Sequence, residues 1–171
     1  MATLEHHEIL LPVNPVFIIF TLVAAAFLNM LPGSGWGLWL RPDFVALLVL
    51  YWCNEQPSKV GFGSAFMLGL LMDVADGALL GQHALAYSIL AYASIVLHRR
   101  VRMFSLTLQV LHVIPLLMVN DLIVLAIRLI AGADFPGYRY FLGSVVAGTL
   151  WPVVSILLKM PQRTRPDPDH V

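Results

Sequence analysis

Residues 61–92, GFGSAFMLGLLMDVADGALLGQHALAYSILAY, decide the fold, because two apolar segments meet there around a polar turn. The turn carries Asp73, Asp76 and His83 in a chain of 171 residues that is 59% hydrophobic and 12% charged. Soluble proteins are typically about 45–50% apolar and about 25% charged. We therefore predict an integral membrane protein built of helices, in which ionisable groups at a segment end need a structural or functional reason.

Length sorts the other apolar runs into candidate membrane spans. A hydrocarbon core of about 30 Å is crossed by about 20 helical residues. Four runs are long enough, and a fifth, 61–72, is so only if it continues towards Asp76. The four are residues 13–31, 83–97, 106–130 and 141–160.

The segment that follows Arg41-Pro42-Asp43 is the doubtful one. Pro42 suits the first position of a helix and Pro57 limits its end, which leaves FVALLVLYWCNEQ between them. This is short for a span, so the helix is tilted, lies in a locally thinned bilayer, or begins earlier, in residues 36–40. The sequence leaves open whether residues 41–53 cross the membrane fully.

Basic residues indicate orientation, because cytoplasmic loops are enriched in Lys and Arg. With six spans, one side collects Lys59, Arg99, Arg100, Arg102, Lys159, Arg163 and Arg165. Both termini are then cytoplasmic. If residues 41–53 do not cross, only the part of the chain before residue 60 changes sides. The turns at 73–83 and 132–140 face outward in either arrangement.

A single domain is predicted, because the loops between the candidate spans leave no room for a soluble one. It comprises residues 1–160, and the polar, proline-rich residues 161–171 are expected to form a short flexible cytoplasmic tail. Ten Lys and Arg balance ten Asp and Glu, so nothing in the charge points to nucleic acid. The lone cysteine, Cys53, is expected to be buried, and Trp52 and Trp151 to lie at the membrane interface.

Small residues recur every four positions along the first half of the opening stretch. Gly61, Ala65, Gly69, Asp73 and Gly77 form one helix face with little bulk, which lets a neighbouring helix approach closely. Residues 143–152 carry a second stripe of small residues, and the last segment is the partner expected for the first stripe. We interpret both stripes as packing between helices of one chain, with a subunit interface as the alternative.

The polar residues of the turn can converge with one from a later segment. Asp73 and Asp76 would share a helix face, and His83 and Asp121 can approach them, which predicts an acidic, histidine-containing pocket at the outer face. The spacing matches no metal-ligand signature, so no metal and no cofactor is predicted. Helix capping is the simpler explanation, and Asp76-Gly77 is typical of a turn.

Asp121 is the best single candidate for a buried polar contact, because Arg128 on the same helix face can reach the membrane surface and Asp121 cannot. If Asp121 is structural, its expected partner is Asn29, Asn120 or His112. The alternative is a role in function or assembly. Catalysis finds no support, since no serine has a base at a recognisable spacing and no GxSxG or HExxH motif occurs.

Several short motifs occur together, in one order, between Arg41 and Pro152. They are Arg41-Pro42-Asp43-Phe44, Leu50-Tyr51-Trp52, Gly69-Leu70-Leu71-Met72-Asp73, Gly77, Leu80-Gly81, His83-Ala84-Leu85-Ala86-Tyr87, Ala91-Tyr92 and Gly148-Thr149-Leu150-Trp151-Pro152. Each is weak by itself. In this combination the chain resembles the MreD family, rod shape-determining proteins of the bacterial inner membrane, in its Gram-negative form.

The resemblance implies an all-α polytopic membrane protein with about six transmembrane helices, similar to the S subunit of energy-coupling-factor transporters. It also implies a non-catalytic, multi-pass subunit of the cell-elongation complex, in contact with membrane lipids. Such a subunit binds MreC and supports rod shape and side-wall peptidoglycan synthesis, together with MreB, RodA and RodA's transpeptidase partner. The likeness to S subunits transfers no pocket residues, because a fold does not fix a function.

Under this hypothesis a set of polar and small residues orients helices or receives the partner. The set is Gly61, Ala65, Gly69, Asp73, Asp76, Gly77, His83 and Asp121. The alternative function is a small-solute-binding membrane transport subunit that uses the outward pocket. The sequence leaves open the oligomeric state and which helix contacts MreC.

Overall fold

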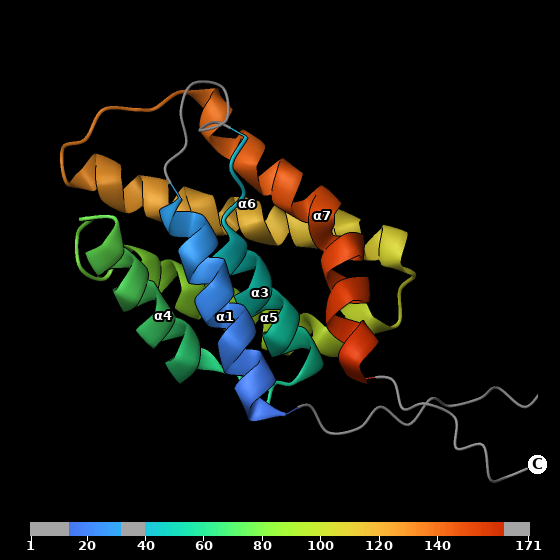
Figure 1. Ribbon diagram of the computed structural model, residues 1–171. Helices are drawn as coiled ribbons and strands as arrows, with labels where there is room; N and C mark the ends of the chain where they lie inside the picture. Colours follow the sequence, from blue (N-terminus) through green and yellow to red (C-terminus); the bar gives the residue numbers. More distant parts are fainter. Residues whose placement is uncertain (1–13, 32–39, 163–171) are drawn as a thin grey trace, which may run out of the picture.

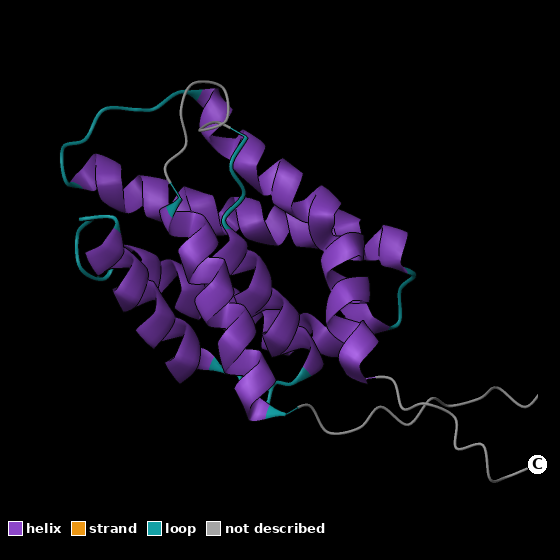
Figure 2. Ribbon diagram, in the orientation of Figure 1, coloured by secondary structure: helices purple, strands orange, loops and turns teal. Residues whose placement is uncertain are grey.

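A computed structural model describes residues 14–31 and 40–162 of the protein, which form helices and loops without a strand (Figure 2). The α-helices are α1 (Pro15–Met30), α3 (Phe44–Glu55), α4 (Phe62–Ala75), α5 (Gln82–Arg102), α6 (Leu106–Ile130) and α7 (Leu142–Lys159). Two short 3-10 helices, η1 (Tyr138–Phe141) and η2 (Met160–Gln162), flank α7. The alternative of an earlier start, in residues 36–40, is not seen in the described part of the chain, because residues 40–43 are not helical and α3 begins at Phe44; residues 36–39 and the tail beyond residue 162 lie outside the described residues.

The shortest α-helix, α3, lies at the centre of the bundle, where it contacts α1, α5, α6 and α7 (Figure 1). Of residues 45–54 only Leu48 is not fully buried. The helix begins after Asp43, whose Oδ1 accepts a hydrogen bond from the Ala46 amide at 3.0 Å. Its 12 residues correspond to roughly 18 Å, so it is shorter than a bilayer core and is enclosed by its neighbours.

Aromatic side chains join α3 to the helices on either side of it. The Trp52 ring packs edge-on against Phe17 of α1, with ring centroids 6.1 Å apart, and the Tyr51 ring packs against Trp151 of α7 at 5.8 Å. Both indoles are hydrogen-bonded: Trp52 donates to Thr21 and Trp151 to Gln109. Each indole N–H finds a buried partner inside the bundle, and the position of these tryptophans at the membrane interface stays a prediction.

The far end of α3 is fixed by charge. Glu55 accepts Lys159 of α7 at 3.2 Å and Arg102 of α5 at 3.7 Å, so one carboxylate joins the ends of three helices. The sequence predicted an apolar segment that ends near residue 97, but the corresponding helix, α5, continues to Arg102. No residue of the basic cluster breaks a helix, and cations are favoured in the last turn by the helix dipole.

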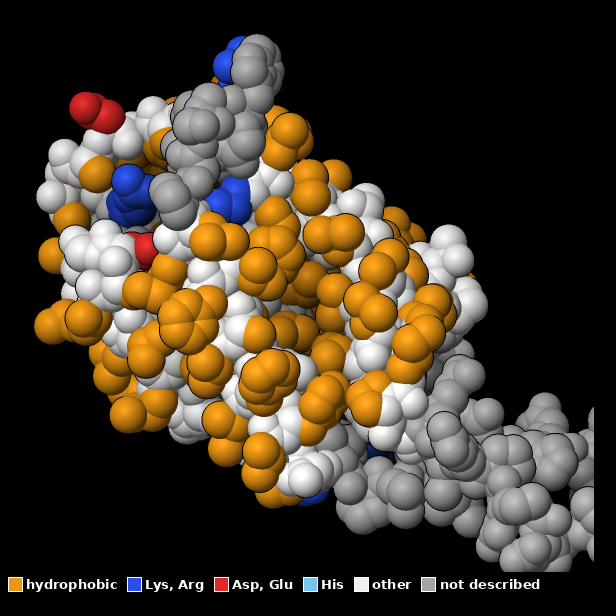
Figure 3. Space-filling model, in the orientation of Figure 1, with side chains coloured by type: hydrophobic (Ala, Val, Ile, Leu, Met, Phe, Trp, Pro, Cys, Tyr) orange, Lys and Arg blue, Asp and Glu red, His pale blue; other side chains and the backbone are white. Residues whose placement is uncertain are grey.

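Two parts of the chain are long and apolar enough to cross a membrane, Leu106–Ile130 and Tyr138–Gln162, and three further helices, α1, α3 and α4, are apolar but shorter. The surface agrees with a lipid environment. Figure 3 shows hydrophobic side chains across the middle of one face, with charged side chains towards its ends. Phe20 is 68% exposed and Val74 70% exposed, and soluble proteins seldom present apolar side chains over so large an area.

The small-residue stripe on α4 faces α5. A Cβ added at Gly69 would lie 2.3 Å from the Cα of Ala84, so the two backbones are in direct contact. The stripe on α7 packs elsewhere, because a Cβ at Gly148 would lie 2.2 Å from Ile114 of α6. The expected partnership between the two stripes is therefore wrong, since the α4 stripe packs on the helix that follows it and the α7 stripe on the helix that precedes it. Packing within one chain, which we favoured, is what the structure shows for Gly69 and Gly148.

Gly69→Ala should lower the melting temperature, because the added methyl group must push α4 away from the backbone of α5. Gly63→Ala on the same helix is the matched control, since nothing lies within 4 Å of its added Cβ and helical alanine is favoured over glycine by roughly 0.5–1 kcal/mol. Thermal unfolding of both variants in detergent tests this. Equal melting temperatures would show that the α4–α5 contact is not close-packed in solution.

Candidate functional site

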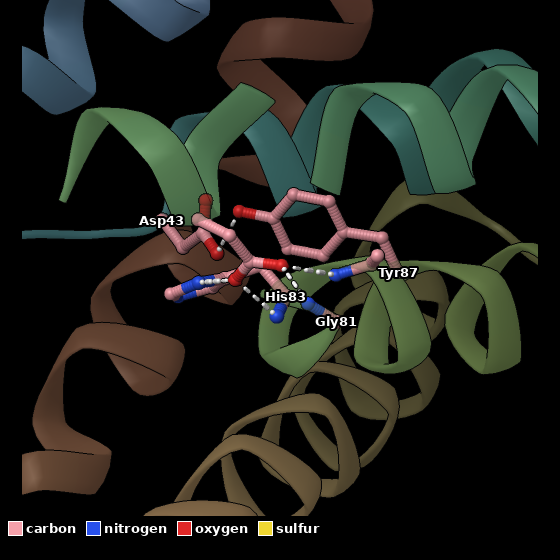
Figure 4. Close-up of polar contacts among 6 residues, drawn as sticks. Asp43, Gly81, His83 and Tyr87 are labelled. Atoms are coloured by element: carbon pink, nitrogen blue, oxygen red, sulfur yellow. Dashed lines mark hydrogen bonds and ion pairs between the residues drawn. The ribbon is translucent and has the colours of Figure 1, made fainter. Parts of the chain in front are cut away.

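Asp73, in the last turn of α4, caps the N-terminus of α5 from outside that helix (Figure 4). Its carboxylate accepts hydrogen bonds from the backbone amides of Gly81 and His83, both at 2.7 Å, and of Ala84 at 3.4 Å. The His83 ring nitrogen Nδ1 lies 2.9 Å from the same carboxylate. Asp73 is fully buried, so these contacts replace the water that it loses.

The residue at the N-cap position of α5 explains why a distant side chain is needed there. Gly81 adopts a positive φ of 100°, which favours glycine, and it has no side chain with which to cap the helix. The first amides of α5 would therefore be unsatisfied without Asp73. The helix dipole also favours a carboxylate at this end. The capping explanation favoured from the sequence is thus observed for Asp73.

A second carboxylate, Asp43, joins three helices beside this cap (Figure 4). Besides capping α3, its Oδ1 accepts the Asn29 side-chain amide of α1 at 2.8 Å, and its Oδ2 accepts the Tyr87 hydroxyl of α5 at 2.8 Å. Asn29 in turn accepts the backbone amide of Phe44 at 2.9 Å. No pattern in the sequence relates these residues to one another, because Asn29 and Tyr87 lie far from Asp43 along the chain.

A cavity of about 390 Å³ opens next to the two carboxylate clusters. It lies between α1, α3, α4, α5 and α6 on one side and the start of α7 on the other. Three of the predicted residues, Asp76, His83 and Asp121, line it together, whereas Asp73 lies behind His83. The other lining residues are Asn29, Arg41, Pro42, Asp43, Met72, Tyr87, Asn120, Val124, Arg128, Pro136, Tyr140, Gly143 and Ser144.

Asp121 finds its partner on α7. The hydroxyl of Ser144 donates a hydrogen bond to its carboxylate, and the Asn120 side chain lies within hydrogen-bonding reach of it. Of the three expected partners, Asn120 alone is near. Asn29 is engaged by Asp43, and His112 bonds to the Leu108 carbonyl towards the other end of α6. Ser144 was missed because nothing in its spacing relates it to Asp121.

The remaining predicted residues have structural places. Ala65 is buried, Gly61 is the N-cap of α4 and Ser64 bonds to it, and Gly77 has a positive φ of 61° in the turn. Asp76 ends α4 and, unlike Asp73, is exposed. The two aspartates therefore do not act as a pair. The predicted Asp76-Gly77 turn is confirmed, and Cys53 is buried as expected.

The cavity is not simply acidic, as the sequence suggested. Arg41 and Arg128 line it together with three aspartates, so it presents both signs of charge. Arg41 donates to the Leu28 carbonyl at 3.3 Å, and Arg128 lies within hydrogen-bonding reach of Tyr140. No group of three His, Cys, Asp or Glu side chains in residues 14–31 and 40–162 is placed to hold a metal ion. This arrangement can receive a polar organic group or a side chain of a partner.

Comparison with known proteins gives two matches. The family model for rod shape-determining protein MreD matches residues 12–161 of the chain. The rod shape-determining protein MreD of Haemophilus influenzae is 32% identical over 124 residues, which cover 72% of this chain and 76% of that protein. No solved structure matches the chain.

Asp73→Asn should destabilise the protein by about 1–3 kcal/mol, because a carboxylate that accepts several hydrogen bonds is replaced by a weaker acceptor with a donor atom. The expected signs are a lower melting temperature in detergent and faster hydrogen exchange at the amides of Gly81, His83 and Ala84. Asp76→Asn, three residues away and exposed, is the control and should behave as the wild type. Unchanged exchange in Asp73→Asn would contradict the capping role.

Proposed function

The chain belongs to the MreD family of rod shape-determining proteins, and on this basis we propose that it is a non-catalytic membrane subunit of the bacterial cell-elongation complex. The family match over most of the chain carries this proposal. In this role it supports rod shape and side-wall peptidoglycan synthesis, acting with MreC, MreB, RodA and RodA's transpeptidase partner. The carboxylates of Asp43 and Asp73 support a non-catalytic role, because both are engaged in holding helix ends.

We place the protein in the inner membrane as a multi-pass domain of residues 1–160, with residues 161–171 as a cytoplasmic tail. All six α-helices would cross or line the bilayer, in a fold like that of S subunits of energy-coupling-factor transporters. The exposed apolar side chains support this proposal. The short α3 needs no lipid contact along its length because other helices surround it. Counting basic residues then places the α4–α5 turn and the cavity at the outer face.

We propose that MreC is the direct partner and that it docks near the outer end of the α4–α5 hairpin. The stripe residues Ala65 and Gly69 are engaged inside the chain, so they would act by orienting the hairpin. Exposed groups at its outer end, among them Asp76 and Gly77, would meet the partner. His83 and Asp121, which line the cavity, would position the surfaces beside them.

Co-purification tests the partnership directly. The tagged full-length chain, extracted in a mild detergent, should retain MreC through affinity purification and size exclusion. An unrelated multi-pass inner-membrane protein with the same tag is the control for adventitious capture. Complete absence of MreC, under conditions that keep other inner-membrane complexes intact, would contradict the proposal that MreC is the direct partner.

Site-specific photocrosslinking tests the location. A photoreactive residue at Val74 or Leu80, which are 70% and 73% exposed, should crosslink to MreC in the native membrane. The matched control is Met103, which is 82% exposed but lies just after the opposite end of α5. Crosslinks from Met103 alone would place the partner at the other end of the hairpin and contradict the docking site, while leaving the partnership itself intact.

A further inference from the structure

The cavity contains a polar atom that the protein does not satisfy. Asn120 is 1% exposed and lines the cavity, yet its Oδ1 has no hydrogen-bond partner. The amide nitrogen of the same side chain lies within reach of the Asp121 carboxylate, so Oδ1 is the atom left over. A buried acceptor without a donor costs about 1–3 kcal/mol. Because Asn120 lines an open cavity, a donor from outside the chain can reach this acceptor.

Other groups that line the cavity with Asn120 favour one kind of donor. Asp121 follows it on α6, and Asp76 lines the same cavity from the end of α4. Three oxygen-bearing groups, two of them carboxylates, favour a cationic donor such as an ammonium group over a neutral hydroxyl. Asp43 also lines the cavity, but both of its oxygens already accept bonds from the protein.

The same cavity holds groups for the opposite charge. The guanidinium side chains of Arg41 and Arg128 come from different parts of the chain, before α3 and near the end of α6. Guanidinium groups pair well with a planar carboxylate. Figure 3 shows basic and acidic side chains close together at the end of the molecule where α4 and α6 end. A ligand that carries only an ammonium group would leave the two arginines without a partner of opposite charge, and a ligand that carries only a carboxylate would leave the aspartates without one.

We propose that this cavity binds a small zwitterion, up to the size of a dipeptide, with its ammonium group at Asn120 Oδ1, Asp121 and Asp76 and its carboxylate at Arg41 and Arg128. The volume of about 390 Å³ lies in the range of small-molecule sites, roughly 300–1,000 Å³. The inference goes beyond the assembly role and does not depend on it. In the proposed topology the ligand enters from the outer face.

The test is binding to the purified full-length chain in detergent, measured by calorimetry and by the shift in melting temperature. The probes are alanine and alanylalanine, each with an N-acetylated form that lacks the ammonium and an amidated form that lacks the carboxylate. We expect at least one zwitterion to bind saturably, and both of its blocked forms to bind at least tenfold more weakly. Failure of both zwitterions, or equal binding of a blocked form, would overturn the proposal.

Single substitutions test whether the zwitterion binds in the cavity. Asn120→Leu and Arg128→Gln should each weaken binding at least tenfold. Asn54→Leu and Arg100→Gln are matched controls, because Asn54 is as deeply buried as Asn120 and has an unpartnered nitrogen, while Arg100 is an exposed arginine at the other end of α5. Zwitterion binding that survives both cavity substitutions would also overturn the proposal.

The melting temperature of the ligand-free Asn120→Leu protein is measured beside its binding, because the substitution removes the unsatisfied acceptor and also the amide that lies within reach of Asp121. If it prevents folding, the exposed Arg128→Gln still decides the outcome. Co-purification of MreC with Arg128→Gln distinguishes this site from the assembly role, since partner binding is expected to persist when zwitterion binding is lost.

Discussion

The carboxylate of Asp43 is the contact on which the arrangement of the bundle depends. It caps the N-terminus of α3 and accepts hydrogen bonds from Asn29 of α1 and Tyr87 of α5, all of 2.8–3.0 Å. In a bilayer interior each of these groups would be costly to leave unpaired. Because the three partners come from three helices, the position of each helix end depends on the other two. At its opposite end α3 is held by Glu55, which pairs with Arg102 and Lys159.

In the proposed membrane arrangement, such contacts would replace the water that a soluble protein offers to its helix ends. A soluble helix can leave its first amides to solvent, but a helix that begins within the bilayer must find acceptors in the protein. Here Asp43 caps its own helix and Asp73 caps the next one. The carboxylates that first suggested a reaction centre are therefore largely structural. The groups that line the cavity and that we assign to a ligand are Asp76, Asp121, Asn120 and the two arginines.

Local patterns in the sequence predicted the helices better than the contacts between them. The run at 106–130 coincides with α6, and the Asp76-Gly77 turn was evident from two adjacent residues. Three features were not predictable in this way. The central place of α3, the Asp43 contacts with Asn29 and Tyr87, and the Ser144–Asp121 bond all join residues distant in the chain. A single sequence carries no spacing signal for such contacts. The sequence therefore predicted an acidic cavity, whereas the structure shows that Arg41 and Arg128 also line it.

The position of the amides that donate to Asp73 also bears on how the chain would enter the membrane. Every amide that Asp73 binds lies within residues 81–84, which emerge from the ribosome after α4 is complete. Before α5 arrives, α4 would present an unpaired carboxylate to lipid, which is unfavourable for a helix inserting alone. Insertion of α4 and α5 as one hairpin avoids that intermediate. In the proposed membrane arrangement, the contact that stabilises the finished protein would thus also favour the entry of α4 and α5 together.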